Sequence, residues 1–505
     1  MQELQLTDQE QARRDKVLKL KELGIDPFGH AFKTNSNTQE IFKKYQDFSG
    51  EDLEKLNKKV KIAGRVVLNR AQGKAGFMHI QDRFGKIQLY VRKDNIEEKD
   101  FHAWKLTDLG DFVGIDGVIF KTHTGELSVR VSKYTYLTKA LKPLPDKFHG
   151  LQDVEEGRRK RYLDLIVNPE IKAVSFMRPK IIKAFRDFFD KKDFIEVDTP
   201  VLHPTLGGAA ARPFVTHHNA LNMPFYLRIA QEIPLKKLIV GGMEKVYEIA
   251  RLFRNEGMDS THNPEFTTLE VYEAYANLDT MMELCETSFR EVAKKVLATT
   301  KVQFGEFALD FAKPFARLHM VDAVKKYANV DFYKIKDFAE AKALADTHHI
   351  KVEPHFEIGH IINAFFEKYV EDKLIEPTFI FGHPVEISPL AKKGPDPRFT
   401  RRFEVFIVGK EYANAYSELN DPLDQRARFE TQLKERASGN AEACELDSEF
   451  LEALEYGMPP TGGLGIGLDR FIMLLTNRQS IRDVILFPHL KRKDNKSNKE
   501  FDDEK

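Results

Sequence analysis

The 505-residue sequence is poor in cysteine, with only Cys285 and Cys444 and no CxxC motif. Two cysteines cannot supply a disulfide framework, and a structural zinc site is not expected without paired cysteine motifs. We therefore expect a reducing compartment, with the cytoplasm as the default. No apolar run approaches the ~20 residues that a membrane span needs, and residues 1–16 contain no apolar segment. We expect neither a membrane span nor a secretory signal.

The sequence also lacks net charge, because 78 Lys and Arg residues balance 78 Asp and Glu residues. A chain that is basic throughout is excluded, so local patches must bind any nucleic-acid partner. The sequence does contain 42% hydrophobic and 31% charged residues, a composition typical of globular proteins. At roughly 150 residues per domain, its length predicts about three domains.

Residues 1–55 are polar and have a helical pattern, and we assign them to an N-terminal helical extension. Thr7 and Glu10 fit a capping box at the start of the first helix, and Gly24 fits the end of that helix. The helix carries five basic residues, which form either a solvated face or a contact with an RNA backbone. They are Arg13, Arg14, Lys16, Lys19 and Lys21.

A small β-barrel is predicted within residues 56–145. Short segments there alternate apolar and polar residues with period two, as half-buried strands do, and turn sequences separate them. The alternating segments are residues 60–62, 87–91 and 127–131, and the turns are 82–85 and 122–125. An OB-fold fits this size. Such barrels bind single-stranded nucleic acid by stacking bases on aromatic side chains beside basic groups. Phe77, Arg65, Arg70 and Lys74 are candidates for this contact.

The remaining chain mixes long helical stretches with β-rich runs and has no regular βαβ alternation. This pattern predicts an α+β domain built on a mostly antiparallel sheet. The predicted parts are a linker at 146–160 that contains glycine, the large domain at 161–490, a helix-rich insertion at about 318–375, and a polar tail at 491–505.

Two segments of the large domain are organised around strands. Residues 185–200 read as an amphipathic helix, a turn and a strand that stops at proline. Residues 247–272 read as two strands that flank a polar loop, with Arg254 and Glu256 on one strand face. A guanidinium in such a place can clamp a phosphate or a carboxylate with two hydrogen bonds.

A third segment, residues 462–475, is rich in glycine and continues as a helix. Its spacing, GxGxGxDR, is not that of a dinucleotide-binding fingerprint, and no βαβ unit surrounds it. Closely spaced glycines instead allow a backbone to pack tightly beneath a ligand. Arg470, at the start of the helix, would then point into that site.

These three segments, in this order, resemble the signature motifs of class II aminoacyl-tRNA synthetases, and further runs resemble the lysyl-tRNA synthetase family. Those runs are residues 157–165, 207–214, 403–407, 413–421 and 456–461. The resemblance extends from the barrel to about His489. It implies an α+β fold with a class II antiparallel-sheet catalytic domain and an N-terminal OB-fold barrel that binds the anticodon. It also implies a homodimer formed through residues 185–200.

The resemblance further implies activation of L-lysine with ATP to lysyl-adenylate and pyrophosphate, with Mg²⁺ as cofactor, and then transfer of lysine to the 3′ end of tRNA(Lys). Arg254 would bridge the lysine carboxylate and the α-phosphate, Phe266 would stack on adenine, and Arg470 would cover the opposite side. By this resemblance the ATP-binding residues are Arg254, Glu256, His262, Phe266, Glu404 and Arg470, of which Arg254 and Arg470 are catalytic, and the magnesium ligands are Glu404 and Glu411. The lysine-binding residues are Gly208, Glu232, Glu270, Tyr272, Asn414, Tyr416 and Glu418, and the anticodon-binding residues are Arg70, Phe77, Gln88 and Glu126.

The sequence departs from the family at three positions. Gln231 stands where proline is usual, Pro234 where tyrosine is usual, and Tyr416 where phenylalanine is more common. Glu232, between the first two, is kept. These changes leave the expected chemistry in place and affect the shape of the lysine pocket.

Three alternatives predict different residues or domains. A related enzyme for aspartate or asparagine would need cationic or amide groups where this chain has Glu418. A paralogue that attaches lysine to a protein would lack the anticodon barrel. A catalytically silent RNA-binding protein would have lost Arg254, Glu404, Glu411 or Arg470, and all four are present.

Overall fold

The computed structural model describes residues 6–145, 151, 153–209, 211–438 and 446–491. It divides into two compact units, Met1–Gln152 and Asp153–Lys505. Cys444, most of the predicted tail and part of the predicted linker lie outside the described residues. Among the helices that are described, none has the length and apolarity to span a bilayer.

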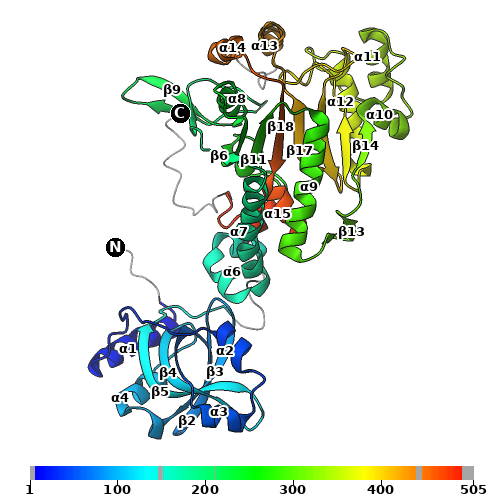
Figure 1. Ribbon diagram of the computed structural model, residues 1–505. Helices are drawn as coiled ribbons and strands as arrows, with labels where there is room; N and C mark the ends of the chain where they lie inside the picture. The colour runs from blue at the N-terminus through cyan, green and yellow to red at the C-terminus, as the bar shows by residue number, and fades with distance from the viewer. Residues whose placement is uncertain (1–5, 146–150, 152, 210, 439–445, 492–505) are drawn as a thin grey trace. The chain divides into compact units, whose positions relative to one another are not determined.

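The first unit is a closed barrel with strand order β1–β2–β3–β5–β4 over its described residues (Figure 1). β3 pairs with β5 in parallel, and the other neighbours pair antiparallel. The predicted barrel and its alternating strands are therefore confirmed. The elements are α1 (Asp8–Glu22), α2 (Thr38–Tyr45), α3 (Gly50–Leu56), β1 (Lys59–Gln72), β2 (Ala75–Gln81), β3 (Lys86–Arg92), η1 (Lys93–Asn95), α4 (Glu98–Lys105), β4 (Phe112–Lys121) and β5 (Leu127–Thr138).

Helix α1 begins and ends as predicted, but part of its basic face has another role. Thr7 and Glu10 form the capping box, and Gly24 takes a φ of 64° just after the helix. Arg13 donates hydrogen bonds to the carbonyl oxygens of Ala140 and Leu109, at 2.9 and 3.0 Å. Lys16 lies 2.6 Å from an Asp108 carboxylate oxygen. These two cations hold the helix on the barrel, so neither a solvated face nor an RNA contact describes them.

The second unit contains an eight-stranded sheet, counted over the described residues, with the order β14–β15–β16–β17–β18–β11–β10–β6. Only its two edge pairs, β14–β15 and β6–β10, are parallel among these strands, so the predicted antiparallel sheet is confirmed. The sheet strands are β6 (Ile195–Glu196), β10 (Lys245–Phe253), β11 (Glu265–Ala274), β14 (Ala316–His319), β15 (Thr378–Phe381), β16 (Arg402–Ile407), β17 (Lys410–Ser417) and β18 (Thr461–Gly467).

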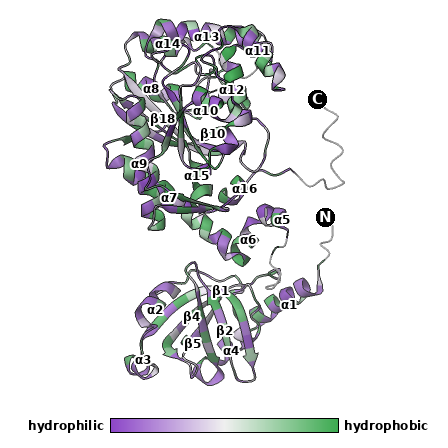
Figure 2. Ribbon diagram, turned by 90° about the vertical axis from the view of Figure 1, so that its right-hand side faces the viewer, coloured by the Kyte–Doolittle hydropathy of each residue, from purple (hydrophilic) through white to green (hydrophobic). Residues whose placement is uncertain are grey.

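The other elements of this unit are helices and small sheets that pack on the central sheet or extend from it (Figure 1). The helices are α5 (Val154–Arg159), α6 (Arg161–Val167), α7 (Pro169–Asp190), α8 (Glu232–Val240), α9 (Leu278–Leu297), α10 (Met320–Ala328), α11 (Phe338–Thr347), α12 (Ile358–Tyr369), η2 (Glu371–Lys373), α13 (Pro422–Ala437), α14 (Ser448–Glu455), α15 (Leu468–Leu475) and α16 (Ile481–Val484). The remaining strands are β7 (Leu202–His203), β8 (Val215–His218), β9 (Met223–Leu227), β12 (Lys301–Phe304) and β13 (Phe307–Asp310). In Figure 2 these helices carry both hydrophilic and hydrophobic residues, as helices that cover a core do.

The central sheet has one apolar face and one polar face. On β11, Leu269 and Val271 belong to the main core, whereas their neighbours Glu270 and Tyr272 line a cavity. The same alternation separates Leu464 and Ile466 of β18, which belong to the core, from the neighbouring glycines Gly463, Gly465 and Gly467. Because successive strand residues point to opposite faces, one strand serves both the core and the site.

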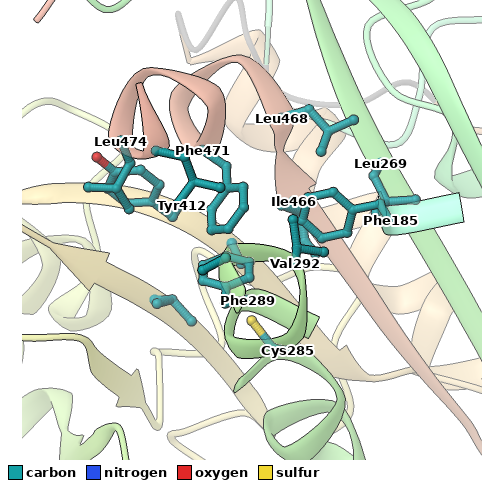
Figure 3. Packing of buried hydrophobic residues seen from close by; sticks show 14 of the residues in the cluster. Phe185, Leu269, Cys285, Phe289, Val292, Tyr412, Ile466, Leu468, Phe471 and Leu474 are labelled. Atoms are coloured by element: carbon teal, nitrogen blue, oxygen red, sulfur yellow. The ribbon is translucent and has the colours of Figure 1, made fainter. Parts of the chain in front are cut away.

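Helices α7, α9 and α15 cover the apolar face with a cluster of aromatic rings (Figure 3). The ring centroid of Phe289 on α9 lies 4.4 Å from that of Phe471 on α15. The ring centroids of Phe311 and Phe315 lie 6.3 and 6.2 Å from that of Phe289. Phe289 is 0% exposed, so the side chain fills the centre of this layer.

Phe289→Ala should remove ring contacts and leave a cavity, at a cost of about 3–5 kcal/mol in unfolding free energy. The loss should be confined to the second unit.

Trp104, the single tryptophan, is buried in the barrel, so its fluorescence reports unfolding of the first unit. We expect the helical circular dichroism signal of the variant to be lost at a lower urea concentration than in the wild type. The urea midpoint of the Trp104 fluorescence transition should not change. Phe487→Ala, at a side chain that is 69% exposed, is the control; an equal loss there would contradict the assignment.

Candidate active site

A cavity of about 770 Å³ opens on the polar face of the central sheet. β11, β16, β17 and β18 form its floor, since every second side chain on them points away from the core. The predicted residues that line it are Gly208, Glu232, Arg254, Glu256, His262, Phe266, Glu270, Tyr272, Glu404, Glu411, Asn414, Tyr416 and Arg470. Glu418 is buried next to Tyr272, over Gly463 of the floor. One cavity thus gathers residues from across some 260 positions of sequence.

Arg254 lies beyond the end of its strand. β10 ends at Phe253, so the prediction that Arg254 and Glu256 share a strand face is wrong, although both line the cavity. The backbone N–H of Arg254 donates to the Pro264 carbonyl oxygen at 2.8 Å, which closes the loop onto β11. Its Nε is buried without a hydrogen-bond partner among the described residues, and its guanidinium carbon lies 5.3 Å from the Phe266 ring centroid. A half-buried cation with a buried free donor favours an anionic ligand.

Arg470 marks the other side of this cationic end. Its Nη1 donates to the Glu411 carbonyl oxygen at 2.8 Å, and its Nη2 lies 3.2 Å from His262 Nε2. The opposite ring nitrogen of His262 lies 2.8 Å from Asp259 Oδ2. A loop histidine and a helix-start arginine therefore meet across the cavity, and each is oriented by a second contact.

Glu404 and Glu411 form a pair of carboxylates on neighbouring strands. Burial opposes ionisation of Glu404, but Arg402 and His383 lower its pKa to about 2. Their contacts are 2.5 Å from Arg402 Nη2 and 3.3 Å from His383 Nε2. Burial, followed by the charge of Glu404, raises the pKa of Glu411. Two carboxylates that repel one another suit a shared divalent cation.

This pair fits Mg²⁺ only together with a ligand. No group of three or more acidic, histidine or cysteine side chains suited to a metal occurs in the described part of the chain. Mg²⁺ is usually held by one or two carboxylates and completed by water and phosphate oxygens. The donor set of Glu404 and Glu411 therefore matches a magnesium–nucleotide complex rather than an all-protein metal centre.

The other end of the cavity is acidic. Burial and the neighbouring Glu232 raise the pKa of Glu270 to about 7. Burial raises the pKa of Glu418 to about 8, although Lys236 opposes the shift. The Tyr272 hydroxyl donates to Glu270 Oε2 at 3.1 Å. Buried carboxylates whose pKa values are raised in this way favour a cationic ligand, because a nearby positive charge stabilises their ionised form.

The three departures from the family leave this end intact. The Gln231 side chain is fully buried, and its Nε2 donates to the Glu248 carbonyl oxygen at 2.8 Å. The added hydroxyl of Tyr416 accepts a hydrogen bond of 3.0 Å from Asn414 Nδ2. Pro234 lies inside the first turn of α8, where a missing N–H is tolerated.

Sequence reasoning missed Lys236. It is 0% exposed, and its Nζ lies 2.5 Å from Glu232 Oε1 and also contacts Glu418 Oε2. A signal was available, because Glu232 and Lys236 are four apart in a predicted helical stretch and such residues face one another. Its meeting with Glu418, 182 positions later in the chain, could not be read from spacing.

Gly463 explains why this strand needs glycine. A Cβ there would lie 2.0 Å from Glu418 Oε1 and 2.6 Å from Tyr272 Cε1. Both side chains therefore occupy the space that any larger residue would take. The glycine-rich run was predicted to pack tightly beneath a ligand. At Gly463 it packs beneath the side chains of Glu418 and Tyr272, and these side chains shape the cavity.

Sequence comparisons agree with this arrangement. Residues 153–491 match the family described as class II tRNA synthetases (D, K and N), and residues 60–137 match the OB-fold nucleic acid binding domain. A lysine–tRNA ligase of Staphylococcus haemolyticus is 57% identical over 493 residues, which cover 97% of this chain and 99% of that protein. A lysine–tRNA ligase of Bacillus subtilis is 56% identical over 490 residues, at 97% and 98% coverage.

The chain belongs to the lysine–tRNA ligase family of class II tRNA synthetases. Its two matched regions, the catalytic domain and the OB-fold, correspond to the predicted fold class. In this synthetase fold the cavity described above lies within the class II region.

The OB-fold places Arg70, Phe77 and Gln88 on the successive strands β1, β2 and β3, and Glu126 in the loop just before β5. Arg70 of β1 lies opposite Phe77 of β2 in the ladder, and Phe77 lies opposite Tyr90 of β3. The Phe77 side chain is 37% exposed, and its ring centroid is 5.1 Å from that of Tyr90. Gln88 Nε2 donates to Glu126 Oε2 at 2.8 Å. The barrel thus brings all four predicted residues together and adds Tyr90, which sequence reasoning did not select.

Gly463→Ala should destabilise the synthetase, because the new methyl group must displace two buried side chains. Overpacking of this kind costs about 1–3 kcal/mol, measured as the shift in the midpoint of urea unfolding. Gly465→Ala is the matched control on the same strand face, since its Cβ would meet nothing closer than 3.7 Å. Equal effects of the two substitutions would show that the Glu418 contact is not the cause.

Proposed function

We propose that the chain activates L-lysine with ATP and transfers it to the 3′ end of tRNA(Lys). The observation that supports this most is the polarity of the cavity. Half-buried Arg254, whose Nε has no hydrogen-bond partner among the described residues, lies at one end, and the carboxylates of Glu232, Glu270 and Glu418 lie at the other. An amino acid with a cationic side chain fits this polarity when its carboxylate faces Arg254.

In the proposed first step, a lysine carboxylate oxygen attacks the α-phosphorus of ATP. A bond forms between that oxygen and phosphorus, the bond to the β-phosphate bridge breaks, and pyrophosphate leaves. The reaction needs positioning and neutralisation of negative charge more than a general base. Arg254 would bridge the carboxylate and the α-phosphate, and Arg470 with His262 would neutralise the departing phosphates.

We propose that the adenine ring stacks on Phe266 and that Glu256 helps to hold it. Glu404 and Glu411 would hold Mg²⁺ with phosphate oxygens of ATP. The ion would supply further neutralisation of the triphosphate. The ion pair between Glu404 and Arg402 keeps that carboxylate ionised and ready to accept a cation.

The matched family covers synthetases marked D, K and N, and the acidic end distinguishes among these substrates. An aspartate side chain would bring a further negative charge beside Glu418, and an asparagine side chain would leave buried carboxylates uncompensated. Leaving a buried charge without a partner is costly. We therefore propose that Glu232 and Gly208 hold the α-ammonium group, that Glu418 and Tyr272 hold the side-chain ammonium group, and that Glu270, Asn414 and Tyr416 line the pocket.

We also propose that the barrel reads the tRNA anticodon. Stacking on Phe77 would supply affinity, Arg70 would contact the backbone, and Gln88 with Glu126 would select bases through their edges. The exposed ring of Phe77 beside Tyr90 supports this proposal.

A homodimer in the cytoplasm completes the proposal. The segment of α7 and β6 and the strands after it present exposed apolar side chains, which favours burial against a second copy. These include Phe176, Ile195, Val201, Leu202 and Val215. The buried free thiol of Cys285 is compatible with a reducing compartment.

Arg254→Ala should abolish lysine-dependent exchange between ATP and pyrophosphate, lowering its rate by about 10²–10³-fold or more. Arg251→Ala, at an exposed arginine of β10 that is ion-paired with Glu265 at 2.7 Å, is the matched control and should keep near-normal exchange. The wild-type protein tests the proposal directly. Absence of exchange with lysine, or near-normal exchange by a folded Arg254→Ala protein, would refute it.

Glu126→Ala should weaken charging of tRNA(Lys) but leave lysine-dependent exchange unchanged. The substitution removes a group that could contact a base edge, a contact worth about 1–3 kcal/mol, and it lies outside the catalytic unit. The measurement is kcat/KM for tRNA beside the exchange rate, with Glu51→Ala on α3 as an exposed control of equal charge change. A parallel fall in both activities would make Glu126 a structural residue.

A further inference from the structure

A lysine of the protein itself lies against the carboxylates at the acidic end of the cavity. Lys236 is on α8, one turn after Glu232, and its ammonium group bridges Glu232 and Glu418. The Phe450 ring centroid on α14 lies 5.8 Å from its Nζ and closes the other side. The two carboxylates that it touches are those assigned above to the two ammonium groups of the substrate.

The charges in this region can be counted. Three carboxylates, those of Glu232, Glu270 and Glu418, lie here with a single resident ammonium group, that of Lys236. The other charged neighbours already have partners: Glu248 of β10 is 2.8 Å from Arg228, and Arg402 of β16 is 2.5 Å from Glu404. The titratable groups that face Lys236 and Glu418 from the packed elements are Glu232 of α8, Glu270 and Tyr272 of β11, and Tyr416 of β17. When all three carboxylates are ionised, the pocket is therefore two positive charges short of balance.

We propose that Lys236 sets this deficit at two, and so makes the pocket select an amino acid that carries two ammonium groups. The inference rests on the proposed function and adds a positioning residue to it. Lys236 acts through Glu232 and Glu418, which touch the substrate, and has no contact with reacting atoms. L-lysine supplies the two missing charges, while its carboxylate is matched by Arg254.

A purely packing role explains this arrangement less well. A buried ammonium group loses its hydration, and an apolar side chain of similar length would fill the same space without that loss. Burial alone opposes the charge on Lys236, yet Glu232 and Glu418 together raise its pKa. The cation is therefore held by its partners, and it contacts one oxygen of each carboxylate. The other oxygen of Glu418 has no hydrogen-bond partner among the described residues.

Lysine binding in this pocket depends on pH. Burial raises the pKa values of Glu270 and Glu418 to about 7 and about 8, and a carboxylate binds a cation when it is ionised. Lysine binding should therefore strengthen as the pH rises from 6 to 8. Without Lys236, Glu418 would hold its proton to higher pH, because a neighbouring cation lowers a carboxylate pKa by about one unit or more.

Lys236→Met is the first test, with kinetics of the exchange reaction as the measurement. At pH 7 we expect the KM for lysine to rise about tenfold or more. The pH range over which this KM decreases should shift to higher pH by about one unit. The preference for lysine over norleucine, a competitor that lacks the side-chain ammonium group, should fall by a similar factor. The KM for ATP should not change. Lys237→Met, at the next residue, where the side chain is paired with Glu449 at 3.2 Å, is the control.

The double variant Lys236→Met with Glu270→Gln separates charge from packing. It removes one cation and one anion, so the deficit returns to two. We expect it to recover much of the lysine preference lost in Lys236→Met. If the two substitutions acted only through packing, their effects would add and the preference would fall further. If Lys236→Met does not fold, recovery of a folded, lysine-selective double variant supports the proposal, and failure of the double variant to fold overturns it.

An unchanged lysine KM, preference and pH profile in folded Lys236→Met would also overturn the inference. Failure of the proposed function gives a different result, because the wild-type protein would then show no exchange with lysine. If the wild-type protein is active and Lys236→Met behaves like Lys237→Met, the proposed role of Lys236 is refuted but the proposed function is not.

Discussion

The alternation of side chains across the central sheet is the constraint on which the rest of the structure depends. Each long strand sends one set of residues into the aromatic layer around Phe289 and the other set into the cavity. A shift of one residue in register would exchange the two sets. The packing of α7, α9 and α15 therefore holds the register, and the register places Glu270, Tyr272 and Asn414 in the site.

Charge within the cavity is segregated along its length. Arginines lie at the end assigned to phosphates, and carboxylates lie at the end assigned to ammonium groups. Buried charges are tolerated when partners surround them, and the pairs Arg228–Glu248 and Arg402–Glu404 show this at the edges of the site. The net charge of zero is a sum over the whole chain and does not reveal these opposed regions, so it says little about the partners of the chain.

Local sequence patterns predicted local structure well where short-range physics decides it. The capping box of Thr7, the strand alternation in the barrel and the helix start before Arg470 are all present. The strand-face argument for Arg254 and Glu256 was wrong, because β10 ends at Phe253 and the loop then sets their directions. Arg13 was likewise not identified as a docking residue, since its acceptors are backbone carbonyl groups more than ninety positions away.

By itself, the sequence determined the α+β class, the barrel, the main elements and the residue types available for binding ATP and an amino acid. These properties follow from periodicity, caps, turns and ordered motifs, which act over a few residues. Only the tertiary structure decided that Lys236 meets Glu418 and that Gly463 leaves room for Glu418 and Tyr272. Such contacts join α8, β11, β17 and β18, and their geometry depends on how the sheet packs, because no local pattern encodes the distance between remote strands.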